Sequence, residues 1–148
     1  MPGLDPKIAV HKLNMQKDIK PVKQGPRRFR PNVMDKIELE VQKLKIVGFI
    51  REEQHPEWLA NIVPVTKKIG QIRVCIDYRD LNNACPKDEF SLPISEVMID
   101  NTCRFERMTF MDGISGYNQL KMHPEDERHT SFRTPFGVYC YTVMSFGL

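Results

Sequence analysis

The sequence predicts one domain of the α+β class, and three observations lead to this prediction. The chain has 148 residues, of which 41% are apolar and 28% charged, a balance typical of a single globular domain with a moderate core. One segment repeats apolar residues at helical spacing, and two others alternate as the strands of hairpins do. Because the helical and strand patterns do not alternate regularly, we expect antiparallel hairpins beside helices, and not a doubly wound parallel sheet.

The helical spacing lies between Pro31 and Val47. Proline suits the first turn of a helix, and Gly48 suits the left-handed residue that ends one, after which Phe49 can fold back onto the last turn. The preceding residues, 1–30, contain four of the chain's 11 prolines and are predicted to be extended. The apolar positions of the helical repeat are Val33, Ile37, Val41 and Leu44.

The first hairpin is predicted from the stretch NIVPVTKKIGQIRVCIDYRDLN, with arms at 62–66 and 72–78. Pro64 indicates an edge strand or a bulge, because proline has no N–H for a strand ladder. In the return arm, one face carries Ile72, Val74, Ile76 and Tyr78, and the other carries Arg73, Cys75, Asp77 and Arg79. The first face is expected to be buried. The second faces either solvent, as in an ordinary amphipathic hairpin, or a ligand.

The rest of the chain is predicted to be a series of short elements. They are a loop at 80–93, a short helix at 95–101, a strand at 105–112, a tight turn at 113–116 and a helix start or strand at 117–122. A polar loop, HPEDER, then leads to a second hairpin that joins 130–134 to 138–144 around the turn PFG.

Charge is distributed unevenly along the chain. Residues 1–36 hold 9 Lys and Arg against 3 Asp, a net charge of +6, whereas residues 37–148 have a net charge of −3. The basic stretch KDIKPVKQGPRRFR is either an arm that binds phosphates or a solvated, proline-containing linker.

The cysteines and histidines do not show the spacing of a zinc site. The four cysteines include no C-x-x-C pair, and the four histidines have no zinc-finger spacing. We interpret the cysteines as free thiols in a reducing compartment. No apolar run is long enough to cross a membrane. We therefore expect no membrane partner and an intracellular, cytoplasmic location.

Two long stretches carry a resemblance to a known family. The runs GFIREEQHPEWLANIVPVTKKIGQIRVCIDYRDLNNACPKDEFSLP and FMDGISGYNQLKMHPEDERHTSFRTPFGVYCYTVMSFGL resemble the reverse transcriptase of gypsy-type LTR retrotransposon Pol polyproteins. The resemblance implies a partial right-hand polymerase fold. Residues 1–20 would be the protease-to-polymerase connector, and residues 21–148 the fingers and an incomplete palm. It also implies an RNA or DNA template-primer and a dNTP as partners.

The family resemblance gives roles to a group of nucleotide-binding residues. Arg73 matches the arginine that grips the triphosphate, and Lys67 or Lys68 matches a lysine at the hairpin tip that reaches the terminal phosphate. Guanidinium and ammonium groups suit phosphate oxygens. Ser115 and Gly116 match positions whose backbone N–H groups hold the triphosphate, and Tyr117 matches the aromatic residue that excludes a ribose 2′-OH.

Asp112 follows an apolar run and precedes a turn of small residues, where an aspartate commonly caps backbone N–H groups. The resemblance instead makes it the first catalytic aspartate, with Gly113 offering a carbonyl to one of two Mg²⁺ ions. Two such ions need several shared carboxylates. The family's other two aspartates lie in a Tyr-x-Asp-Asp motif, and these 148 residues contain no Asp-Asp dipeptide.

We therefore expect weak or no Mg²⁺ binding and a reverse transcriptase fragment that is inactive by itself. The alternatives are a nucleic-acid-binding remnant that is not an enzyme, or a relic without function.

Overall fold

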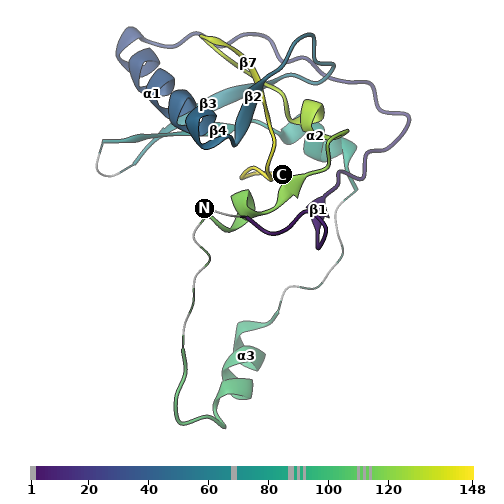
Figure 1. Cartoon of the computed structure of the whole chain (residues 1–148), viewed down its shortest axis with the longest axis vertical. Coiled ribbons are helices and arrows are strands. Elements are labelled where there is room, and N and C mark those ends of the chain that lie inside the picture. The colour runs from purple at the N-terminus through teal and green to yellow at the C-terminus, as the bar shows by residue number, and fades with distance from the viewer. Residues whose placement is uncertain are drawn as a thin grey trace.

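The computed structural model describes residues 3–67, 70–86, 89, 91, 93–109, 111, 113 and 115–148. These residues form a mixed five-stranded sheet, a two-stranded sheet and three α-helices, which confirms the α+β class (Figure 1). In chain order the elements are β1 (Val10–His11), α1 (Pro31–Val47), β2 (Ile50–Glu52), β3 (Ala60–Thr66), β4 (Ile72–Ile76), α2 (Arg79–Ala84), α3 (Ser95–Thr102), the 3-10 helix η1 (Gly116–Gln119), β5 (Lys121–Met122), the 3-10 helix η2 (Glu127–Thr130), β6 (Phe132–Thr134) and β7 (Gly137–Tyr141).

The large sheet has the strand order β2-β7-β6-β3-β4. All of its pairs are antiparallel except β3 with β6, which run parallel over two residues of each strand. The sheet therefore joins the two hairpins, although some 50 residues separate them in the chain. The second sheet pairs β1 with β5 in parallel, so the extended N-terminal segment lies beside residues 121–122.

Helix α1 covers the sheet and ends as the sequence predicts. Ile37 and Val41 are fully buried in the core that the helix shares with the sheet. Gly48 adopts the left-handed conformation at φ 77°. Its N–H donates to the Lys45 carbonyl at 3.0 Å, and the Phe49 N–H donates to the Leu44 carbonyl at 3.0 Å. This pair of bonds closes the helix and turns the chain into β2.

The predicted first hairpin is confirmed as β3 and β4, with Ile62 opposite Ile76 and Thr66 opposite Ile72. The Asp77 N–H donates to the Asn61 carbonyl at 2.9 Å, so hydrogen-bonded pairs recur at every second residue from there. Pro64 falls between two such pairs, and its nitrogen faces away from β4. Strand β6 pairs only with Ala60 and Asn61 on that side. Strand β3 is thus an inner strand of the sheet, not the edge strand expected, but at Pro64 its side opposite β4 has no partner among the described strands.

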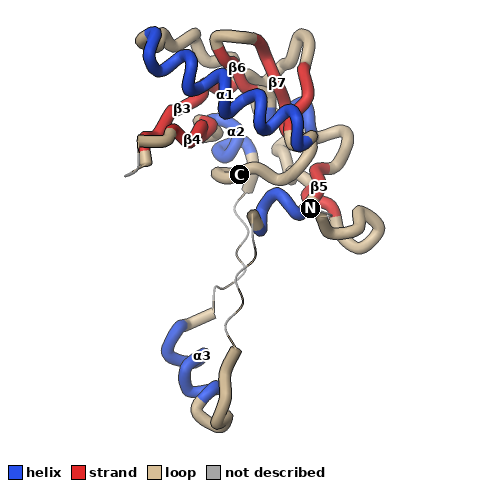
Figure 2. Tube along the Cα trace, turned by 60° about the vertical axis from the view of Figure 1, so that its left-hand side comes forward, coloured by secondary structure: helices blue, strands red, loops and turns tan. Residues whose placement is uncertain are grey.

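The second predicted hairpin is confirmed as β6 and β7, with Thr134 opposite Gly137. The Thr134 hydroxyl donates to the Gly137 carbonyl at 3.0 Å and accepts from the Phe136 N–H at 3.1 Å. The predicted helix at 95–101 is also confirmed, as α3. It buries none of its residues and lies apart from the sheet in two views (Figures 1 and 2).

Two predicted elements are wrong. The expected loop at 80–93 begins with helix α2, because Leu81 and Ala84, three residues apart, both pack into the core. The expected strand at 105–112 does not form in its described residues, 105–109 and 111. Their large apolar side chains are exposed, and none of the described strands runs beside them to share backbone hydrogen bonds.

The other short predictions hold in part. Residues 117–122 contain both the alternatives expected, since η1 is followed by β5. In the expected turn at 113–116, Ser115 is left-handed at φ 51°.

All four cysteines are free. Among the described residues, no helix combines the length and apolar character needed to cross a membrane.

Candidate functional site

The tip of the β3–β4 hairpin presents two cationic side chains to solvent. Lys67 and Arg73 are both exposed, and the side chain of neither makes a hydrogen bond or ion pair with another described residue. Two backbone hydrogen bonds close the base of the turn. The Lys67 N–H donates to the Gln71 carbonyl at 2.7 Å, and the Lys67 carbonyl accepts from the Gly70 N–H at 2.9 Å. Lys68 lies outside the described residues.

The turn expected to hold a triphosphate is centred on Ser115. This residue has φ 51° and ψ 45° and leads directly into η1, whose Asn118 N–H donates to the Ser115 carbonyl at 2.9 Å. A left-handed residue next to a helical one points successive N–H groups to one side, a geometry that binds anions. Gly113 and Gly116 are exposed, and a side chain at Gly116 would meet open space. Asp112 lies outside the described residues.

Tyr117 contacts Phe146 from the segment after β7. Their ring centroids are 5.8 Å apart and the rings are inclined by 83°, the edge-to-face arrangement that aromatic pairs favour. Both side chains remain more than half exposed, at 53% for Tyr117 and 60% for Phe146. The pair therefore orients the Tyr117 ring while leaving much of it free to touch a ligand.

The described residues of the predicted site lie in two places, the β3–β4 hairpin and the turn around Ser115. No hydrogen bond or ion pair among them joins Lys67 or Arg73 to the turn around Ser115. In the described part of the chain, no group of three or more His, Cys, Asp or Glu side chains is arranged to hold a metal ion. The described residues by themselves do not fit a two-magnesium centre. Binding of magnesium by Asp112 and Gly113 stays a prediction.

The sequence prediction is wrong about Asp77. Its strand face was expected to contact solvent or a ligand. Its side chain is buried and clamped between two arginines. Arg79 donates from Nε at 2.7 Å and from Nη2 at 2.8 Å, and Arg27 donates from Nη2 at 2.9 Å. The hydrogen bond from Arg79 is the main cause that lowers the pKa of Asp77, against the raising effect of burial. The sequence contained one indication of the pair with Arg79, because alternation places Asp77 and Arg79 on the same face of the predicted strand.

The basic arm is held on the hairpin over residues 22–27. The Gln24 N–H donates to the Leu59 carbonyl at 2.8 Å, and the Leu59 N–H donates to the Val22 carbonyl at 3.0 Å. Asn61 donates from Nδ2 to the Gly25 carbonyl at 2.7 Å, and its N–H donates to the Gln24 side chain at 2.8 Å. This part of the arm is therefore hydrogen-bonded to Leu59 and Asn61, although most of its residues are exposed, and phosphate binding by the arm stays a prediction.

Beside the docked arm lies a groove with a volume of about 350 Å³. Its walls come from the arm, the first turn of α1 and the turn between β6 and β7. Three arginines line it, namely Arg27, Arg28 and Arg133. Sequence reasoning singled out the charge of the arm but not Arg133, which the fold adds from a strand more than 100 residues later.

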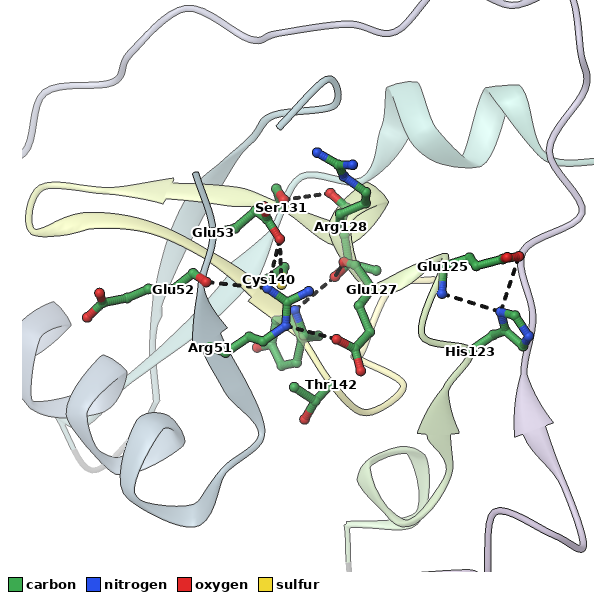
Figure 3. Close-up of polar contacts among 12 residues, drawn as sticks. Arg51, Glu52, Glu53, His123, Glu125, Glu127, Arg128, Ser131, Cys140 and Thr142 are labelled. Carbon is green, nitrogen blue, oxygen red and sulfur yellow. Dashed lines mark hydrogen bonds and ion pairs between the residues drawn. The ribbon is translucent and has the colours of Figure 1, made fainter. Parts of the chain in front are cut away.

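A second charged cluster connects β2, η2 and β7 (Figure 3). Arg51 donates from Nε to Glu127 at 2.9 Å and from Nη1 to Glu53 at 2.8 Å. The Cys140 thiol lies 3.8 Å from the same Glu53 carboxylate, and burial raises the pKa of Cys140 to about 12. Every member has a partner within the cluster, so we assign it a structural role.

Comparison with known proteins indicates the same family as the sequence motifs. No family model matches the chain. It is 31% identical over 116 residues to the retrovirus-related Pol polyprotein from transposon 297 of Drosophila melanogaster, a match that spans 76% of this chain and 11% of the relative. With the Pol polyprotein of transposon 412 from the same organism, it shares 30% identity over 151 residues, covering 95% and 12%.

Solved structures show where the fold occurs. The chain matches a crystal structure of the prototype foamy virus protease-reverse transcriptase with a TM-score of 0.79 and 22% identity, over 94% of this chain and 18% of that one. It also matches a foamy viral protease-reverse transcriptase in complex with double-stranded DNA, with a TM-score of 0.72 and 18% identity. The described fold is thus shared with one part of these polymerases. The chain spans about a tenth of the length of the two curated relatives.

Proposed function

We propose that this chain, which is homologous to a segment of retrotransposon Pol polyproteins, is the fingers and the beginning of the palm of an RNA-directed DNA polymerase. One observation carries the proposal. On a fold shared with reverse transcriptases, the β3–β4 hairpin projects two cationic side chains, Lys67 and Arg73, that no described residue neutralises. Exposed, unpaired cations at a hairpin tip suit a ligand rich in phosphate.

In the proposed site, each residue of this chain has one task. Arg73 and a tip lysine, Lys67 or Lys68, hold the triphosphate of an incoming dNTP by charge-assisted hydrogen bonds. The backbone N–H groups around Ser115 and Gly116 hold phosphate oxygens, since a left-handed residue beside a helical one concentrates N–H donors. Tyr117 lies against the sugar and excludes a 2′-OH by its bulk, and Phe146 fixes the plane of its ring.

Magnesium ions would supply charge neutralisation at the reacting phosphate, and Asp112 with the Gly113 carbonyl would hold one of them. A complete centre needs more carboxylates than the described residues gather. Residues 1–148 contain no Asp-Asp dipeptide. We propose that they do not extend a primer by themselves and that the remaining carboxylates come from residues outside 1–148. Without that geometry, positioning and charge stabilisation of the transferred phosphoryl group are lost.

Primer extension with an RNA or DNA template, dNTPs and magnesium tests this proposal. Two proteins are compared, residues 1–148 and a longer form that continues through a Tyr-x-Asp-Asp segment and thumb built on the curated relatives. We expect extension only by the longer form, and its loss on Asp112→Asn. Asp100→Asn, which removes an exposed acid on α3, is the matched control and should retain activity. A folded longer form that cannot extend, or a short form whose activity depends on Asp112, would refute the proposal.

A second function has an observation in its favour. The groove lined by three arginines needs no metal ion to attract nucleic acid, so residues 1–148 could act as a binding module that is not an enzyme. Nucleic-acid binding that persists in EDTA, together with an inactive longer form, would favour this alternative over the polymerase.

A further inference from the structure

One hydrogen bond joins helix α2 to the turn that follows β7, and the proposed chemistry does not use it. The Asn82 side chain donates from Nδ2 to the Gly147 carbonyl at 2.7 Å, although 65 positions separate the two residues in the sequence. Both residues are exposed. A single hydrogen bond contributes only modestly to the stability of a fold. Its main consequence is therefore the geometry of the segment that it holds in place.

Helix α2 gives the Asn82 amide a firmly packed base. Leu81 and Ala84, on either side of Asn82 in the sequence, are buried in the core. The Asn82 N–H donates to the Tyr78 carbonyl at 2.8 Å. Tyr78 is buried too, and its hydroxyl donates to the Thr130 carbonyl at 2.9 Å. The Asn82 side chain thus projects from a helix whose opposite face is fixed in the core.

The turn that accepts this bond carries Phe146. On the N-terminal side of the turn, the Met144 N–H donates to the Leu120 carbonyl at 2.8 Å, directly after η1. On the C-terminal side, Gly147 has a left-handed φ of 98° and its carbonyl binds Asn82. Phe146 therefore lies between two hydrogen-bonded positions, one before it and one after it in the sequence.

Phe146 in turn contacts the ring of Tyr117. The two rings meet edge to face, with their centroids 5.8 Å apart. Because more than half of each side chain is exposed, the protein encloses neither ring. The orientation of Tyr117 therefore depends on where the turn places Phe146.

From this series of contacts we infer that Asn82 is a positioning residue for sugar selection. Its bond to Gly147 holds the turn in place, and the turn keeps the ring of Phe146 against that of Tyr117. The inference rests on the proposed function, which assigns Tyr117 to the sugar of the dNTP, and adds a residue that acts through others. Because α2 follows β4, the strand that carries Arg73, the same bond connects the sugar site to the hairpin proposed to hold the triphosphate.

The test compares incorporation of dTTP and UTP by the longer form of the chain and measures kcat and KM for each nucleotide. Asn82→Ala is expected to raise incorporation of UTP relative to dTTP by about two- to fivefold, as for the loss of one exposed hydrogen bond. Asn82→Asp should raise the ratio at least as much, because a carboxylate of nearly the same shape cannot donate. Asn82→Gln keeps a donor and should recover part of the discrimination.

A double-mutant cycle distinguishes positioning from a general loss of stability. Without the Phe146 ring, the Asn82 bond has no side chain to orient. Asn82→Ala combined with Phe146→Ala should therefore give the same ratio as Phe146→Ala alone. In a Tyr117→Ala background, Asn82→Ala should likewise add no further change. The change should fall mainly on kcat/KM for UTP, whereas a purely structural defect would lower kcat/KM for both nucleotides together.

Asn83→Ala is the matched control. Asn83 is the next residue of α2, it is also exposed, and its side chain makes no hydrogen bond to another described residue. Its removal should leave the ratio unchanged. In residues 1–148 without nucleotide, the nuclear Overhauser effect between the Tyr117 and Phe146 rings should weaken in Asn82→Ala and persist in Asn83→Ala. The melting temperature of each variant is measured as well, so that unfolding is recognised.

Two outcomes in an active longer form overturn the inference. One is that Asn82→Ala and Asn83→Ala give the same ratio of UTP to dTTP. The other is that the effects of Asn82→Ala and Phe146→Ala add. An inactive longer form instead refutes the proposed function. The ring contact in residues 1–148 then decides the role of Asn82: an unchanged contact in Asn82→Ala overturns positioning, and a weakened one supports it.

Discussion

Arg27 and Asp77 are 50 residues apart in the sequence, and an ion pair of 2.9 Å joins them at the edge of the hairpin. This contact connects the basic arm to the β3–β4 hairpin. Asp77 belongs to a strand face that the sequence predicts to be exposed, but its carboxylate is buried and binds two arginines. The pair holds the arm against the hairpin a few residues before the start of α1.

The first prediction concerns this anchor and pH. Because the pKa of Asp77 is lowered in the folded chain, its contribution to stability is present above the unfolded pKa and is lost as the pH falls through the folded value. Asp77→Asn should lower the free energy of unfolding by about 1 kcal/mol at pH 7, because its arginine bonds are weakened. The difference from wild type should shrink as the pH falls from about 5 towards about 3.

Urea unfolding at a series of pH values measures this difference. Asp100→Asn on the exposed helix α3 is the control and should leave stability unchanged. A destabilisation by Asp77→Asn that stays constant down to pH 3 would contradict the ion-pair explanation.

The second prediction concerns the end of α1. Gly48 is left-handed at φ 77°, and a side chain added there would meet no atom within 4 Å. Gly48→Ala should therefore cost only the backbone strain, about 1 kcal/mol of unfolding free energy in urea, and Gly48→Asn should cost less. Gly25→Ala is the matched control, since it also meets open space and has no left-handed φ. Equal effects at the two glycines would argue against the cap.

The third prediction concerns cysteine reactivity. Cys140 is fully buried and burial raises its pKa to about 12, whereas Cys103 is exposed on the segment after α3. Because the thiolate is the reactive form, a thiol reagent at pH 8 should label Cys103 rapidly and Cys140 only as the chain unfolds. Mass spectrometry of labelled peptides, with Cys103→Ser as the control, measures both rates. Rapid labelling of Cys140 in the folded chain would be inconsistent with the packing of β7.

The fourth prediction follows from the proposed polymerase and the Tyr117–Phe146 contact. In the longer, active form, Tyr117→Ala should admit ribonucleotides, raising their incorporation relative to dNTPs by at least about tenfold, because a steric contact with the 2′-OH is removed. Phe146→Ala should raise it less, since the ring of Tyr117 remains but loses its orientation. Single-nucleotide incorporation kinetics with dTTP and UTP measure the ratio. An unchanged ratio in Tyr117→Ala would remove Tyr117 from the sugar site.

Much of the local structure follows from the sequence alone. The helical repeat, Pro31 and Gly48 predict the bounds of α1, because a helix period and its end residues are local properties. Alternation and turn residues predict both hairpins for the same reason. The family motifs predict which side chains are candidates at the hairpin tip and the Ser115 turn.

Tertiary structure decided the rest, because those features depend on contacts between distant segments. The parallel pairing of β3 with β6 joins the two hairpins into one sheet and places Arg133 in a groove with Arg27 and Arg28. The burial of Asp77 required an arginine 50 residues away, which no local pattern indicates. The segment 105–109 has a strand-like sequence but none of the described strands beside it, so its backbone has no ladder to join.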